Sequence, residues 1–245
     1  MKKITEIKFS DLDLKVLNNF IKINKNLLIK KNTNKITTIN PAKNIYAEYF
    51  SSTFNSKVDL CFYDFNEFLY FYFQIPNPKI IEVYSDKKEI STNQFREVFI
   101  IKIKNKDYEF NYELSEKNIL IVPEKDCFST LEYFYSFKIS KQVTEKIFSN
   151  KDKKLFSRYK FFIENGDLKF QKCNENLRDL KNFKYCLNKK SNQNFIAEFS
   201  TEYINIFFSD YEVSVSNQYV IKLKNNHINL NYLIALEKNS KFENN

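Results

Sequence analysis

The stretch FYDFNEFLYFYFQI, residues 62–75, decides how this chain is organised. Most of its residues are aromatic or aliphatic, and only Asp64 and Glu67 are charged. Asp64 is suited to cap a helix that follows the strand-like VDLCFY, and Pro76 would end that helix. We therefore predict a short helix whose aromatic side chains enter the core. A surface for stacking nucleic-acid bases is the other interpretation, but such surfaces usually interleave Arg or Lys, and this stretch has neither.

Two further segments show helical periodicity. Residues 10–24 repeat apolar side chains at helical spacing behind Ser10, a suitable N-cap, and residues 140–155 begin at Ser140 in the same way. Short stretches of alternating apolar and polar residues make up most of the rest and predict antiparallel strands. These strands are expected over residues 26–31, 35–40, 44–50, 57–63, 79–85, 95–105, 108–114 and 118–122, and then over 134–139, 158–164, 167–173, 182–188, 194–199, 212–216, 219–225 and 231–237.

Three pairs of similar segments recur in the same order, which predicts an internal repeat. KFS at 8–10 matches KIS at 138–140, NEFLYFYF at 66–73 matches TEYINIFF at 201–208, and LIVPE at 120–124 matches LIALE at 233–237. We therefore expect two copies of one unit, each with two helices and about eight strands. The second copy's second helix would begin at Ser200 or Thr201.

The composition argues against several classes of enzyme. The chain has one glycine, Gly166, which follows Asn165 in a predicted hairpin turn, so Gly-rich phosphate-binding loops are absent. Its one histidine, His227, lies in a turn-like segment, and the carboxylates form no recognisable catalytic frame. We expect neither catalysis nor a cofactor nor a metal site.

The charge and the cysteines bear on partners and location. The formal net charge is +9, which suggests a polyanionic partner such as DNA, although lysine-rich codon bias would give the same charge. Four widely spaced cysteines without a CxxC pair are expected to be reduced, mostly buried thiols. No stretch has the length of a transmembrane helix or the pattern of a signal peptide, so we expect a cytoplasmic protein without membrane contact.

Residues 16–69 resemble the N-terminal half of the sliding clamp of T-even-type bacteriophages, the DNA polymerase processivity factor. The similar features are Asn19-Phe20 and Ile23-Asn24 at the end of the first helix, Tyr46-Ala47-Glu48, and the run from Tyr63 to Leu69. The segment HINLNYLIALEKNS is similar to the family's closing strand, and residues 156–176 share its hairpin pattern. The resemblance is thin over residues 76–135.

The resemblance implies an α+β DNA-clamp fold with two similar domains per chain, each with two helices packed on antiparallel sheets, assembling into a ring of three subunits. We expect an N-terminal domain over residues 1–124, a linker over 125–132 and a C-terminal domain over 133–245. The ring would encircle double-stranded DNA in an infected bacterial cell and tether the replicative DNA polymerase, after loading by an ATP-dependent clamp loader. Clamps of this family also serve late transcription, which makes late-transcription factors of RNA polymerase further expected partners.

Such a ring attracts phosphates without reading bases, and mobile lysines on helices that face the hole suit this task. The expected DNA-facing residues are Lys15, Lys22, Lys25, Lys141, Lys146, Lys153 and Lys154. In similar clamps an apolar pocket beside the linker and the last strand receives the partners' C-terminal tails. Here that pocket would comprise Val122, Val213, Tyr219, Leu233, Ala235 and Leu236.

Ring closure would pair an edge strand within residues 112–121 with one at 182–188. The alternatives are a monomeric β-rich protein that binds single-stranded nucleic acid, and a structural or virion protein without a role on DNA.

Overall fold

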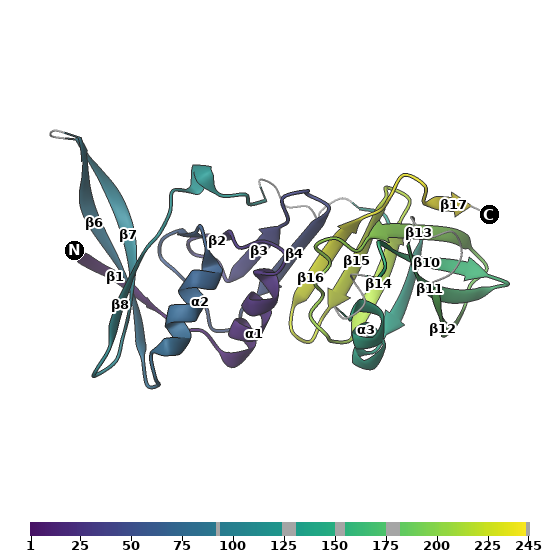
Figure 1. The fold of residues 1–245 in the computed structure, drawn as a ribbon, viewed down its shortest axis with the longest axis horizontal. Helices are drawn as coiled ribbons and strands as arrows, with labels where there is room; N and C mark the ends of the chain where they lie inside the picture. Colours follow the sequence, from purple (N-terminus) through teal and green to yellow (C-terminus); the bar gives the residue numbers. More distant parts are fainter. Residues whose placement is uncertain (92–93, 124–130, 150–154, 175–181, 244–245) are drawn as a thin grey trace. The chain divides into compact units, whose positions relative to one another are not determined.

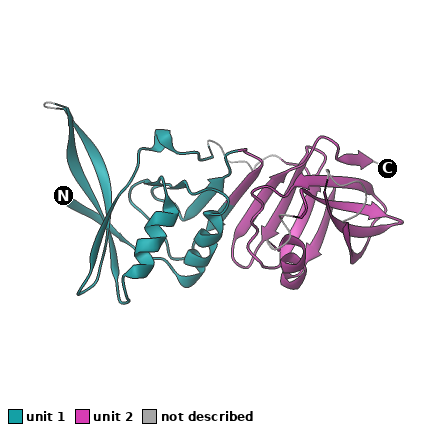
Figure 2. Cartoon of the chain, in the orientation of Figure 1, with its two compact units in different colours: residues 1–41, 48–124 teal, residues 42–47, 125–245 magenta. Residues whose placement is uncertain are grey.

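The computed structural model describes residues 1–91, 94–123, 131–149, 155–174 and 182–243. The chain divides into two compact units, and each is described by itself below (Figures 1 and 2). Unit 1 comprises residues 1–41 and 48–124, and unit 2 comprises residues 42–47 and 125–245. The domain and linker bounds expected from the sequence stay a prediction, and most of the expected linker lies outside the described residues.

Unit 1 contains two helices and two antiparallel sheets. Its elements are β1 (Lys2–Ile7), α1 (Asp11–Phe20), β2 (Leu27–Ile29), β3 (Lys35–Ile39), β4 (Ile45–Phe50), β5 (Leu60–Phe62), α2 (Phe65–Gln74), β6 (Ile80–Ser91), β7 (Gln94–Lys104), β8 (Glu109–Glu113) and a 3₁₀ turn at Lys117–Ile119. One sheet has the order β1-β6-β7-β8, and the other contains β5-β2-β3-β4. The division between the units falls within β4, after Ala47.

Unit 2 repeats this order of strands. Its elements are β9 (Tyr135–Ile139), α3 (Lys141–Phe148), β10 (Arg158–Glu164), β11 (Asp167–Cys173), β12 (Phe183–Lys190), β13 (Asn194–Ser200), β14 (Tyr211–Ser216), β15 (Val220–Asn225), β16 (Leu230–Ala235) and β17 (Lys241–Glu243). The order β9-β14-β15-β16 corresponds to β1-β6-β7-β8, and β13-β10-β11-β12 corresponds to β5-β2-β3-β4. Residues 42–47 run beside β16, where the Ala235 N–H donates to the Asn44 carbonyl at 2.8 Å.

The stretch at residues 62–75 forms the predicted helix α2. The Asp64 carboxylate accepts a hydrogen bond from the Glu67 N–H at 3.1 Å and thereby caps the helix. Its buried side chains are those of Phe65, Phe68, Leu69 and Tyr72, so the core prediction is confirmed for these four. Tyr70 and Phe73, in contrast, are about 60% exposed.

The turn between β10 and β11 confirms the predicted hairpin. Asn165 and Gly166 have φ values of 54° and 76°, and Glu164 pairs with Asp167 across the two-residue turn. Both turn residues need positive φ in this geometry, which asparagine tolerates and glycine adopts freely.

The predicted second helix of unit 2 is wrong. Residues 201–210 form turns and irregular backbone, and only ten residues separate β13 from β14. Tyr203 has φ of 62°, outside the right-handed helical region. The Phe207 N–H donates to the Tyr232 hydroxyl at 3.1 Å, and the Phe207 carbonyl accepts from the Tyr211 hydroxyl at 2.7 Å. Buried tyrosines thus take the backbone groups that a helix would use.

The predicted strand at residues 118–122 is also wrong, together with the repeat match of LIVPE to LIALE. Residues 117–119 form a 3₁₀ turn, while residues 233–235 belong to β16. The Ile121 N–H donates to the Asn26 side chain at 3.0 Å, and the Ile121 carbonyl accepts from the Asn24 side chain at 2.9 Å. Two asparagine side chains therefore satisfy backbone groups that would otherwise pair with a strand.

The match of KFS to KIS is confirmed, because Ser10 and Ser140 cap α1 and α3. Both helices are shorter than predicted. Residues 150–154, near the end of the predicted helix at 140–155, lie outside the described residues. Two strands, β1 and β17, were missed. Cys61 is a buried free thiol, whereas Cys186 is exposed, and Cys127 lies outside the described residues.

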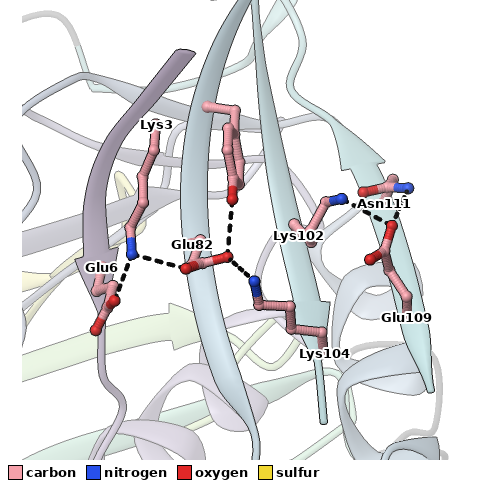
Figure 3. Close-up of polar contacts among 8 residues, drawn as sticks. Lys3, Glu6, Glu82, Lys102, Lys104, Glu109 and Asn111 are labelled. Atoms are coloured by element: carbon pink, nitrogen blue, oxygen red, sulfur yellow. Dashed lines mark hydrogen bonds and ion pairs between the residues drawn. The ribbon is translucent and has the colours of Figure 1, made fainter. Parts of the chain in front are cut away.

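A buried carboxylate joins three strands of the first sheet (Figure 3). Glu82 on β6 accepts from the Lys3 ammonium of β1 at 2.7 Å, and its other oxygen lies 2.6 Å from the Lys104 ammonium of β7. The Tyr84 hydroxyl donates to the same carboxylate at 2.9 Å. Hydrogen bonds from Lys104 and Lys3 lower the pKa of Glu82 to about 2, from an ordinary 4.5.

Replacing Phe68 with Ala is expected to lower the free energy of unfolding by about 3–5 kcal/mol, because it leaves a cavity where a fully buried ring packs against Phe65 and Phe62. The matched Phe73→Ala variant on the exposed face of α2 should change it by no more than about 0.5 kcal/mol. Urea unfolding of both variants measures the difference. Equal losses would contradict the division of α2 into buried and exposed faces.

Replacing Glu82 with Gln is expected to destabilise the protein in a pH-dependent way. Because the pKa of Glu82 is lower in the folded protein than in the unfolded chain, its charged carboxylate stabilises the fold above about pH 4.5. This stabilisation is lost as the pH falls toward 2. The urea midpoint of the variant should therefore lie below that of the unaltered protein at pH 7, and the gap should shrink between pH 5 and pH 3. A gap of constant size over this range would show that the Glu82 carboxylate is not selectively charged in the folded state.

Candidate functional site

Lys15 and Lys22 lie on the exposed side of the first helical segment. Helix α1 buries Val16, Leu17 and Phe20, so its opposite face is free to carry charge. Lys15 lies on α1 and Lys22 in the turn that follows Phe20, and both are exposed. Their placement agrees with a surface that attracts phosphate, although their role on DNA stays a prediction.

A buried network anchors α1 and thereby orients these lysines. The Asp13 carboxylate accepts from the Ser10 N–H at 2.7 Å, from the Tyr49 hydroxyl at 2.8 Å and from the Thr53 hydroxyl at 2.6 Å. In return the Ser10 hydroxyl accepts from the Asp13 N–H at 3.1 Å, which completes a capping box. Burial raises the pKa of Asp13, but these hydrogen bonds outweigh it, so the pKa is lowered and the carboxylate is charged.

Lys25 is less available to a phosphate than its sequence position suggested. Its ammonium lies 3.3 Å from the Asp64 carboxylate and 5.4 Å from the centre of the Tyr63 ring. Asp64 is the N-cap of α2, so Lys25 neutralises a charge that the fold itself requires.

Unit 2 supplies Lys141 and Lys146 from α3, and both are exposed. The Lys141 N–H donates to the Asp210 carboxylate at 2.6 Å, which fixes the start of the helix. Lys146 lies 4.1 Å from the centre of the Tyr185 ring on β12, a distance typical of a cation–π contact. Lys153 and Lys154 lie outside the described residues.

The six residues of the expected partner pocket differ in exposure. Val122, in unit 1, packs on a cluster of Leu28, Cys61 and Leu120. In unit 2, Val213 and Leu233 are buried in the sheet, Leu236 is half-buried, and Ala235 and Tyr219 are exposed. The pocket stays a prediction, and Tyr219 and Leu236 are its members best placed to meet a partner.

Of the strands that end the three sheets in the described part of the chain, two correspond to the edges expected for ring closure. These are β8 in the order β1-β6-β7-β8 and β12 in the order β12-β11-β10-β13-β17. The expected edge strand at residues 182–188 overlaps β12, and that at 112–121 overlaps only the end of β8 (Glu109–Glu113); their pairing in a ring stays a prediction. Figure 3 shows the Lys102–Glu109 ion pair, at 2.7 Å, that ties β8 to β7.

An aromatic surface that the sequence analysis missed joins α2 to the β8 edge. The ring of Phe71 on α2 stacks on that of Phe110 on β8, with centres 4.1 Å apart and planes 18° apart. Tyr70 is next to it and largely exposed. The signal was present in the sequence, because a helix of this composition has more aromatic residues than one buried face can take.

The described residues contain no cluster of His, Cys, Asp and Glu side chains that could hold a metal ion. His227 lies exposed in a turn, where its N–H donates to the Asn225 side chain at 2.9 Å. In the same described part of the chain, none of the helices is both long and apolar enough to cross a membrane.

Comparison with known proteins identifies the fold. No protein-family model matches the chain, and no curated protein matches it in sequence. Among solved structures, the chain is similar to one from the PCNA2–PCNA3 complex of Sulfolobus tokodaii, with a TM-score of 0.64 and 12% sequence identity. The match covers 95% of this chain and 99% of that one, so the chain has the sliding-clamp fold seen in PCNA.

Proposed function

We propose that this protein is a sliding clamp, a homotrimeric ring that encircles duplex DNA and tethers a replicative DNA polymerase. The observation that carries this proposal is a clamp fold over 95% of the chain. The net charge of +9 agrees with a polyanion as the encircled partner. The role is mechanical rather than enzymatic, and an ATP-dependent loader would open the ring.

The repeat within the chain supports closure of the ring through β8 and β12. In unit 2, β16 lies beside residues 42–47, which include the first residues of β4. By the correspondence of strand orders, β8 is the counterpart of β16, and β12 is the counterpart of β4. Pairing β8 of one copy with β12 of the next would repeat an arrangement that the chain already uses. Head-to-tail pairing of this kind removes both open edges when the ring closes.

The aromatic surface beside β8 would provide apolar packing at the same contact. Phe71, Phe110 and the exposed Tyr70 lie where a second copy would approach the edge. Aromatic residues are among those that carry most of the binding energy at protein interfaces.

Sliding requires attraction to phosphates without recognition of bases. Lysine suits this purpose because its ammonium is a mobile point charge on a flexible stem. Lys15, Lys141 and Lys146 are exposed on helices, and Lys22 is exposed in the turn after α1; these four are the strongest candidates among the described residues. Release of counterions from the DNA would make the attraction dependent on salt.

The proposed partners are the replicative polymerase, the clamp loader and, in a bacteriophage setting, factors of late transcription. Their tails would use an apolar pocket that includes Tyr219 and Leu236. The second candidate function is a monomeric binder of single-stranded nucleic acid, which the exposed Tyr70 and Phe73 favour as stacking residues. Topology separates the two functions, because a clamp stays on circular DNA and leaves a free linear end.

Changing Lys15, Lys22, Lys141 and Lys146 to Glu is expected to impair loading and processive synthesis on primed circular DNA at least tenfold, without loss of the assembly. The reason is that eight units of charge per chain are removed from the surface that would face phosphate. A primer-extension assay with polymerase and loader measures product length. The control variant changes four other exposed lysines to Glu, namely Lys30, Lys57, Lys106 and Lys241. Lys88, Lys102, Lys104 and Lys169 are unsuitable as controls, because they form ion pairs with Glu113, Glu109, Glu82 and Glu164. Unchanged processivity of the first variant would refute the DNA-facing assignment.

Light scattering across a concentration series tests the ring. We expect an approach to three times the 29.5 kDa of one chain, about 88 kDa. Tyr70→Glu should shift the mass toward one chain, because a charge would enter the aromatic surface beside β8. Phe95→Glu, at an exposed aromatic residue on β7, is the control and should leave the mass unchanged. A strict monomer at high concentration would rule out the topological mechanism and favour the single-strand binder.

A further inference from the structure

The segment after β16, residues 236–243, lies along the edge of β13 within unit 2. The Glu237 N–H donates to the Glu198 carbonyl at 2.7 Å, and the Ser240 hydroxyl accepts from the Glu198 N–H at 3.0 Å. Ser240 is buried, so residues 237–240 form a firm anchor. Beyond this anchor, β17 pairs antiparallel with residues 194–196 of β13.

One aromatic side chain dominates the contact that β17 makes. The Phe242 ring lies 5.5 Å from that of Phe134 and 5.5 Å from that of Tyr219, at near-perpendicular angles of 73° and 85°. Its backbone is paired opposite the buried Phe195. Tyr219 is still 43% exposed, so this aromatic niche is at the surface of the unit.

The pairing of β17 with β13 covers only part of the β13 edge. Only three residues pair, and the side chains of Lys241 and Glu243 on either side of Phe242 are exposed. Beside Phe242, the Asn194 side-chain amide donates a hydrogen bond to the Glu243 carboxylate at 3.2 Å. A three-residue strand at the edge of a sheet opens more readily than a longer strand in its middle.

We propose that the edge of β13 is a peptide-binding edge, which β17 occupies in the free chain and from which an incoming peptide displaces it. The incoming segment is extended, pairs antiparallel with residues 194–196, and places an aromatic side chain between Phe134 and Tyr219. This is strand addition to an exposed sheet edge, in which backbone hydrogen bonds give affinity and a side-chain niche gives specificity.

The sequence of β17 indicates the chemistry of the peptide. Lys241, Phe242 and Glu243 present a basic, an aromatic and an acidic residue in turn, and the acidic one bonds to Asn194. A pocket of about 240 Å³ adjoins the strand and is lined by Ile163, Asn194, Phe195, Ile196, Lys241 and Glu243. A partner peptide of the same pattern would find room there for side chains larger than those of β17.

By occupying this edge, β17 competes with a partner peptide and lowers its apparent affinity. Tyr219 also accepts the Leu236 N–H through its carbonyl at 2.8 Å, so the niche adjoins two members of the expected partner pocket. The identity of the peptide as the tail of a clamp partner rests on the proposed function, whereas displacement of β17 by a peptide does not. All the contacts lie within unit 2, so peptide binding at this edge does not require a ring.

The test uses a fluorescent peptide, KNSKFE, which has the sequence of residues 238–243. Its binding is measured by anisotropy to the full chain and to a chain that ends at Ser240, which keeps the anchor. We expect the shortened chain to bind at least about tenfold more tightly, because an attached tail competes at an effective concentration in the millimolar range. The full chain with Phe242→Ala should bind like the shortened one, and Lys241→Ala should bind like the unaltered chain. A peptide with Ala in place of Phe should bind to none of them.

Equal binding to the full and shortened chains, or equal binding of the Phe and Ala peptides, would overturn the proposal. If the shortened chain fails to fold, as judged by circular dichroism and thermal unfolding, the full chain with Phe242→Ala provides the same comparison. The mass in light scattering reports separately on the proposed ring. A monomer that binds the peptide would refute the ring alone, and a trimer that does not bind it would refute the peptide-binding edge alone.

Discussion

The structure depends on one constraint, the need to pair or cover the edges of antiparallel sheets. In unit 1 the Ser115 N–H donates to the Cys61 carbonyl at 2.8 Å, so the segment after β8 covers the edge of β5. In unit 2 the segment after β16 covers the edge of β13 in the corresponding way, through Glu237 and then β17. The edges of β8 and β12 are the two that the proposed ring would pair between neighbouring copies.

The segments that cover the edges of β5 and β13 differ in how firmly they are bound. After Ser115 the chain is fastened by Asn24 and Asn26, whose side chains bond to the backbone of Ile121. After Ser240 the chain is held mainly by Phe242 between two aromatic rings. One edge is therefore part of the permanent fold, while the other is suited to exchange with a partner segment.

Charge and packing are separated on the helices. Helix α1 is fixed by the buried Asp13, whose hydrogen bonds are all within unit 1, and this leaves Lys15 and Lys22 free at the surface. Helix α2 has no lysine and has aromatic side chains on both faces, so it serves packing more than attraction to phosphate. Lys25 illustrates the limit of sequence reasoning, because its partner Asp64 is distant along the chain but adjacent in the fold.

Local sequence signals determined the capped starts of α1, α2 and α3, the Asn165-Gly166 turn, most strands and the existence of a repeat. These features depend on neighbouring residues, so they could be predicted from the sequence. The tertiary structure alone decided that residues 201–208 are irregular and that residues 118–122 form no strand, since Tyr211, Tyr232, Asn24 and Asn26 reach in from elsewhere to take their backbone hydrogen bonds. It also decided which edges are open and where β17 lies. The physical reason is that a backbone group accepts whichever partner the fold brings close, and a local pattern does not specify that partner.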